Sequence, residues 1–340
     1  MVSRAEPAVR FLLTSADPSV RYFTLFDLLE TTSHSHEATT AFSQILTGPR
    51  VTALIDGQHV GTRHSPDSLG LHPGGFGAHP YKKWDGAHWR LVSLVELGLP
   101  AHEPRAMKAA DQVLQWLTSN FHRSKIRTID GRVRRCASQE GNALAVCSRL
   151  GLAGDPRVQY LAASLMAWQW PDGGWNCDKR PNAHHSSFYE SLSPLWGLIE
   201  FYRATWEPAA LRAAQRTVEL FLDHRLFRST STGNVIDSEW LKLHYPPYWH
   251  YDILQALLIL ARFDELSEAH NVMRDARVQE ALNLLEAKRR PDGCWHAEGF
   301  FWAPQGKRAS NVDVADWGRR GPNEMITLNA LRVLKAAGRW

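Results

Sequence analysis

Apolar residues along the chain recur at intervals of three and four, the spacing of one face of an α-helix. Two kinds of helical segment alternate. Amphipathic segments are predicted near residues 6–14, 37–48, 103–119, 155–168, 207–223 and 275–288. Segments that are apolar on almost all sides are predicted over residues 20–30, 86–98, 139–151, 187–202, 249–263 and 323–338. Because a helix that is apolar all round is normally enclosed by others, we expect an inner ring of apolar helices and an outer ring of amphipathic ones.

An internal repeat supports this arrangement. Residues 155–175 and 275–295 align without a gap, and ten of the 21 positions are identical. Each copy begins with Asp, a good helix N-cap, and reaches a Pro-Asp-Gly turn near its end. Repeats of this kind are typical of arrays or closed rings of one supersecondary unit. We therefore predict an all-α fold, an (α/α)6 toroid of six helical hairpins, formed by residues 1–340 as a single domain.

An open helical solenoid is the alternative architecture. The segment DPSVRYFTLFDLLE, which begins at Asp17, resembles one helix of a HEAT-like stack. Long connections are expected at 50–84, 121–138 and 296–322. Loops of this length are uncommon unless they have a function, so they favour the toroid.

The first repeat contains a family motif. The segment from Gln169 to Trp175, Gln-Trp-Pro-Asp-Gly-Gly-Trp, resembles the Gln-x-x-x-Gly-x-Trp repeat of squalene–hopene and oxidosqualene cyclases. Those enzymes share an α/α toroid with the β subunits of protein prenyltransferases. The second copy keeps Gly293 and Trp295 but has Arg289 in place of Gln. The resemblance implies the toroid fold and a structural role for the motif, so its Gln and Trp residues are not expected to be catalytic.

The chain departs from these families at their reactive residues. The Asp-x-Asp-Asp acid of the cyclases is missing, because Asp313-Val-Ala-Asp316 has a different spacing. The prenyltransferases bind zinc through an Asp-x-Cys and a later His that follows Phe-Tyr. Here Arg134 replaces the Asp before Cys136, and Glu190 stands where that His would be. A zinc site of the prenyltransferase type is therefore not predicted.

In a toroid the inner helices run parallel, so their N-termini gather at one mouth of the cavity. Free N–H groups and the helix dipoles make such a mouth suitable for an anionic group. The candidate catalytic residues near these ends are Glu140, Glu190, His250, Asp252 and Glu324. The candidate substrate-binding residues are Arg21, His88, Trp89, Arg134, Tyr189, Trp249 and Tyr251. The alternative is that the acids only compensate helix dipoles and the aromatic residues only fill the core.

Three functions fit this set of residues. The first is a terpene-cyclase-like enzyme that acts by acid–base chemistry on an isoprenoid or another apolar small molecule with an anionic end. The second is a sugar-acid hydrolase or lyase on an α/α toroid. The third is a toroid that binds a ligand or a peptide without catalysis. A deep apolar chamber favours the first, an open polar groove the second, and a cavity filled by side chains the third.

Composition narrows the class of protein. Fourteen Trp residues are a high number for 340 residues, and they suggest a wide interior or a ligand cavity. The formal net charge of +4 is spread without long basic runs, which argues against nucleic acid as a partner. No apolar stretch is long enough for a membrane span, and the four Cys residues have no regular spacing, so a cytoplasmic protein with reduced thiols is expected. No cofactor is predicted, although zinc on Cys177 or Cys294 with neighbouring His residues stays open. The oligomeric state is not predicted.

Overall fold

The computed structural model describes residues 6–32, 35–58, 75–266 and 271–340. These residues are mainly helical, which confirms the all-α class. Among them, no helix has both the length and the apolar character that crossing a membrane requires.

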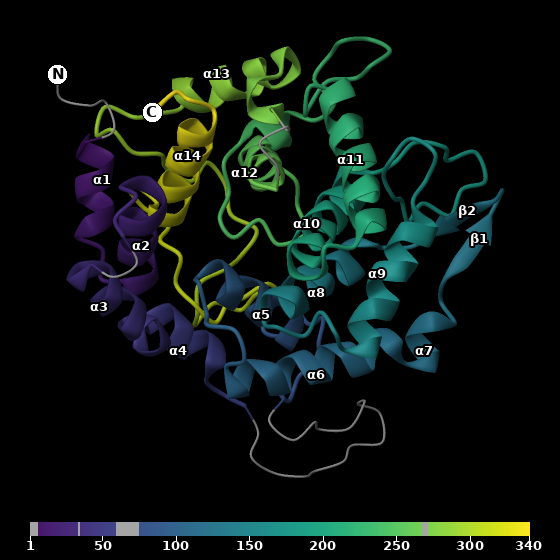
Figure 1. Cartoon of the computed structure of the whole chain (residues 1–340), viewed down its shortest axis with the longest axis horizontal. Coiled ribbons are helices and arrows are strands. Elements are labelled where there is room, and N and C mark those ends of the chain that lie inside the picture. The colour runs from purple at the N-terminus through teal and green to yellow at the C-terminus, as the bar shows by residue number, and fades with distance from the viewer. Residues whose placement is uncertain (1–5, 33–34, 59–74, 267–270) are drawn as a thin grey trace.

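Five largely buried helices lie toward the middle of the molecule (Figure 1). They are α5 (Ala87–Glu96), α8 (Ser138–Arg149), α10 (Phe188–Thr205), α12 (Ile253–Asp264) and α14 (Glu324–Ala336). Helices α8 and α10 approach each other most closely, because a Cβ atom added at Gly141 would lie 2.3 Å from the backbone nitrogen of Pro194. In the same way, a Cβ atom added at Gly197 of α10 would lie 2.5 Å from the carbonyl oxygen of Gly141. These two glycines therefore set the spacing of the helices that carry most of the polar site described below.

The amphipathic helices lie around the periphery (Figure 1). They are α1 (Glu6–Leu13), α3 (His36–Gln44), α6 (Pro104–Thr118), α9 (Pro156–Trp168), α11 (Pro208–Asp223) and α13 (Gln279–Ala287). Carboxylates of Glu103, Asp155 and Glu207 accept backbone N–H groups at the starts of α6, α9 and α11, each just before a Pro. Such caps satisfy N–H groups that the helix itself leaves without partners. Positions for all six predicted amphipathic helices are thus confirmed to within a few residues.

Shorter elements complete the chain. They are α2 (Pro18–Phe23), η1 (Thr24–Leu28), η2 (Ile45–Thr47), α4 (Pro49–Ile55), α7 (Asn120–Arg123), η3 (Ser238–Leu241), η4 (Val272–Arg274) and η5 (Ala276–Val278). The last helix, α14, contacts α1, α2 and η1, so the two ends of the chain pack together.

Three local features differ from the prediction. Strands β1 (Arg127–Ile129) and β2 (Arg132–Arg134) form an antiparallel hairpin inside the expected 121–138 connection. Its turn, Asp130-Gly131, has positive φ at both residues, which is the Asp-Gly hairpin signal in the sequence. Helix α4 occupies the start of the expected 50–84 loop, of which residues 59–74 lie outside the described part of the chain. Helix α12 begins at Ile253 instead of residue 249, because Asp252 caps it.

The two sequence repeats make the same hydrogen bonds. The indole nitrogen of Trp175 donates to the carbonyl oxygen of Leu165 at 3.0 Å, and that of Trp295 donates to Leu285 at 2.7 Å. The backbone nitrogens of the two Trp residues donate at 3.1 Å to hydroxyls on α10 and α14, those of Ser191 and Thr327. Each motif therefore ties the end of a peripheral helix to the next central helix, which supports a structural role.

Replacing Gly173 with Ala is expected to lower the free energy of unfolding by at least about 2 kcal/mol. Gly173 has φ +96°, and an added Cβ would lie 2.3 Å from the carbonyl oxygen of Arg216. Gly233→Ala is the matched control, because Gly233 has φ +71° but no heavy atom within 4 Å of the added Cβ. The control should lose only about 1 kcal/mol of stability in urea denaturation. Equal losses in the two variants would contradict the close contact.

Candidate functional site

A buried ionic cluster lies at the start of α8. The carboxylate of Glu140, which is 1% exposed, accepts a hydrogen bond from Nε of Arg135 at 2.8 Å. The same oxygen, Oε1, lies 3.0 Å from Nε2 of His122 on α7, and Arg135 also contacts His122. Burial by itself raises the pKa of Glu140, but the His122 hydrogen bond and the Arg135 charge outweigh it, so the pKa lies below its usual value. Glu140 is therefore a buried carboxylate held in its ionised form.

Next to this cluster are buried polar atoms without hydrogen-bond partners among the described residues. They include Oε2 of Glu140, Nε2 of His88 and Nδ2 of Asn142. Desolvation lowers the pKa of His88 to about 3, so this imidazole is neutral near pH 7. Buried polar groups in native proteins are normally paired, and those that are not require an explanation such as a water or a ligand. A neutral imidazole and a free carboxylate oxygen can each accept a proton.

An aromatic cavity lies beside the ionic cluster. Its volume is about 50 Å³, which is room for a few water molecules. Its wall includes Tyr189, Trp196, Tyr248, Trp249 and His250, and Asn142 of α8 also lines it. The lining is thus mainly aromatic and apolar, with a few polar groups.

Tyr81 connects the cavity wall to the ionic cluster. Its ring lies 6.5 Å from the Trp249 ring of the wall and 5.2 Å from the His88 ring. Burial raises the pKa of Tyr81, and the nearby charges of Glu190 and Glu140 raise it further, so its hydroxyl stays protonated. The hydroxyl can therefore donate a hydrogen bond at the border of the cavity.

His250 lies in the cavity wall but makes few polar contacts. Its Nδ1 is 3.0 Å from the carbonyl oxygen of Pro247, and its ring stacks on Phe301 at 3.5 Å. Burial lowers its pKa to about 4, so it is neutral near pH 7. His250 thus lies in the cavity wall, and among the described residues it makes no hydrogen bond to Asp252.

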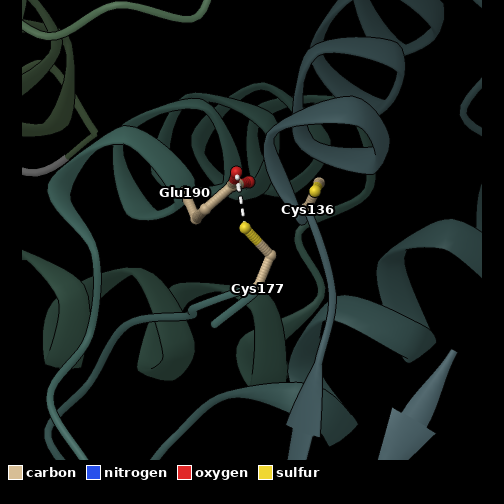
Figure 2. Close-up of side chains that lie close together, drawn as sticks. All are labelled: Cys136, Cys177 and Glu190. Carbon is tan, nitrogen blue, oxygen red and sulfur yellow. Dashed lines mark hydrogen bonds between the residues drawn. The ribbon is translucent and has the colours of Figure 1, made fainter. Parts of the chain in front are cut away.

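Two thiols and a carboxylate meet where the loop after the first repeat passes the starts of α8 and α10. Figure 2 shows the sulfur of Cys177 directed at the carboxylate of Glu190, with the sulfur of Cys136 close by. Cys177 donates to Glu190 Oε1 at 3.6 Å, and Glu190 Oε2 accepts the backbone N–H of Ser138 at 3.0 Å. Burial raises the pKa of Glu190.

Several predicted site residues are engaged in structural contacts instead. Asp252 is fully buried, caps α12 through Gln255 and accepts the backbone N–H of His244. Tyr251 is buried and donates its hydroxyl hydrogen to the carbonyl oxygen of Leu226 at 2.6 Å. Tyr251 also lines the aromatic cavity, whereas Asp252 does not.

The remaining predicted residues, Glu140 and His88 among them, do not line the cavity. Glu324 pairs with Arg50 at 2.7 Å, and Arg21 donates to Ser15 and Gln44 near the first helices. Trp89 is fully buried and packs on Trp84. Arg134 is buried, donates to Ala183 at 2.8 Å, and has two guanidinium nitrogens without a partner among the described residues.

Sequence reasoning missed His122 and Tyr81. Both lie in connections between predicted helices, and neither belongs to a motif. Their positions beside Glu140 and His88 arise only when α5, α6 and α8 pack together. No local sequence signal marks them.

Comparisons with known proteins gave no match to a family model, to a curated protein or to a solved structure. The candidate site therefore rests on its own geometry.

Proposed function

We propose that the chain is an (α/α)6 toroid enzyme, similar to terpenoid cyclases and prenyltransferases, which accepts an isoprenoid or another apolar small molecule with an anionic end. The contact of α14 with the first helices and the alternation of central and peripheral helices support the toroid. One observation carries the proposed activity. Glu140 is fully buried, with one carboxylate oxygen held by His122 and Arg135 and the other without a partner beside His88.

The cavity favours an apolar substrate over a sugar acid. Trp196, Tyr248 and Trp249 present aromatic surface, and each aromatic face can stabilise a positive charge by ~0.5–2 kcal/mol. The anionic end of the substrate would bind at the starts of the central helices, where N–H groups and the helix dipoles favour an anion. A sugar-acid hydrolase or lyase would require a more open and polar groove, and the cavity of about 650 Å³ lined by Glu96, Arg149 and Arg332 is the candidate for it.

Glu140 is the proposed base. Its Oε2 takes a proton from the substrate, the broken bond leaves its electron pair on the substrate, and Arg135 and His122 hold the carboxylate in place. His88 is a neutral second acceptor at the same position, and the Tyr81 hydroxyl a donor. General acid–base groups of this kind typically contribute about 10²–10⁴-fold to a rate.

The test is turnover of a panel of prenyl diphosphates by the purified chain, followed by mass spectrometry of the products. Glu140→Gln should lower kcat by about 10²–10⁴-fold and change KM little, because Gln keeps the shape but cannot accept a proton. His184→Gln is the control, since His184 is exposed and its side chain contacts only Asn182 and His185 among the described residues. Tight binding of a prenyl diphosphate without turnover would instead support a binding protein. Full activity of Glu140→Gln would exclude Glu140 as the base.

A further inference from the structure

The Cys136, Cys177 and Glu190 side chains converge from three separate segments. Cys136 precedes α8, Cys177 follows the first repeat, and Glu190 lies in the first turn of α10. The two sulfurs and one carboxylate oxygen all lie within 4.8 Å of one another (Figure 2). All three residues are only partly buried, so an ion from solvent can reach them.

The second repeat shows that the fold does not need these groups. The shared hydrogen bonds align Trp175 with Trp295 and Ser191 with Thr327. On this alignment Cys177 corresponds to Ala297, and Glu190 corresponds to Ile326. The same turn and the same helix start therefore form with two apolar side chains at these positions. The structural role of the hairpin therefore does not explain the thiol of Cys177 and the carboxylate of Glu190, and another role is needed.

The electrostatics of the cluster favour a cation. Among the described residues, the Glu190 carboxylate bonds to the Ser138 N–H and the Cys177 thiol and to no cationic side chain. The guanidinium of Arg135, the residue before Cys136, is bound to Glu140 and Gln139. A divalent ion would neutralise the three groups together and would let the thiols ionise.

We propose that Cys136, Cys177 and Glu190 bind one Zn²⁺ ion. Thiolates select zinc over magnesium and calcium, which prefer ligand sets made only of oxygen. Three protein ligands leave one position of a tetrahedron for water or another ligand, the arrangement of a catalytic zinc site. The Ser138 N–H holds the second carboxylate oxygen at 3.0 Å and fixes the orientation of Glu190.

This site differs from the zinc site that the prenyltransferase resemblance implies. Cys136 and Glu190 occupy the positions of its Cys and its His, but Arg134 stands where its Asp would be. Cys177, which comes from a different loop, supplies the third ligand. The sequence analysis did not bring these three residues together, because they are 41 and 13 residues apart along the chain.

The test uses the full chain, loaded with Co²⁺ or Zn²⁺ under reducing, oxygen-free conditions. We expect one bound metal per chain by elemental analysis, and a thiolate-to-cobalt charge-transfer band in the near ultraviolet. Cys136→Ser and Cys177→Ser should each weaken binding by more than about 100-fold in competition with a chromophoric chelator, since loss even of a supporting group costs 10–100-fold. Glu190→Gln should bind more weakly but keep the charge-transfer band.

Cys294→Ser is the matched control, because Cys294 lies at the equivalent turn of the second repeat and outside the cluster. It should bind metal as the unmodified chain does. Circular dichroism establishes that each variant is folded before its metal content is compared. Two results would overturn the proposal: metal content that is equal in the unmodified chain and in Cys136→Ser/Cys177→Ser, or a disulfide between the two sulfurs under the loading conditions. Neither readout depends on turnover, so the proposed reaction and the metal site can fail separately.

Discussion

Glu140→Ala is expected to lower the free energy of unfolding by about 3–5 kcal/mol. The carboxylate is buried, and its loss would leave the buried guanidinium of Arg135, 9% exposed, without its anionic partner. Breaking one half of a buried ion pair is costly because the remaining charge is neither solvated nor compensated. Urea denaturation followed by far-ultraviolet circular dichroism measures the loss.

A double variant separates the ion pair from simple loss of packing. Glu140→Ala/Arg135→Met removes both charges, and it should be more stable than Glu140→Ala alone. Arg135 also donates to Gln139 at 2.8 Å, so Arg135→Met by itself gives the reference value for the cycle. If the double variant loses the sum of the two single losses, the pair is not coupled and the ionic cluster does not act as a unit.

Stability is expected to fall steeply as the pH drops from about 6.5 to about 3, partly because of His88. The folded-state pKa of His88 is about 3, below the ordinary value of 6.5 for an unfolded chain. Between these values the unfolded chain binds a proton that the folded chain does not, so acidification favours unfolding. Over this pH range, the proton uptake of His88 lowers the free energy of unfolding by at most about 5 kcal/mol. Above pH 6.5 this group contributes no pH dependence.

His88→Gln should flatten this acid branch, because Gln does not titrate. The variant and the unmodified chain are compared by urea denaturation at a series of pH values, with the exposed His184→Gln as control. Glu140 and His122 lie near His88, and its ring contacts Tyr81, Trp89 and Trp116. The lowered pKa of Glu140 adds a loss in the same direction, but only as the pH falls below the usual value near 4.5. An unchanged slope between pH 6.5 and 4.5 in His88→Gln would show that His88 is not buried in its neutral form.

The spacing of apolar residues and the helix caps were sufficient to predict the positions of most helices. Period and caps placed α6, α9 and α11 within a residue or two, because Glu103, Asp155 and Glu207 each precede a Pro that favours the first helical position. The resemblance of the repeat to the cyclase motif implied a structural role, and the hydrogen bonds of the two Trp side chains support it. The start of α12 was misplaced, because the aromatic string before Asp252 is as apolar as the helix itself.

Only some residues of the candidate site could be predicted from the sequence. Glu140, Glu190 and His88 were found because each lies in the first turn of an apolar helix, where a charged or polar side chain is conspicuous. The same criterion also selected Asp252 and Glu324, which make a cap and an ion pair. A first-turn acid has the same sequence signature whether it caps a helix or faces a ligand. Only its partners separate the two roles.

The sequence by itself determined the all-α class and the order of the helices, because these depend on residues that are near one another along the chain. Tertiary structure decided which polar atoms stay without partners. His122 reaches Glu140 from 18 residues away, and Cys177 reaches Glu190 across 13 residues and Cys136 across 41. Hydrogen bonding and metal binding depend on distances of a few ångströms, and loop closure between segments leaves no periodic trace in the sequence.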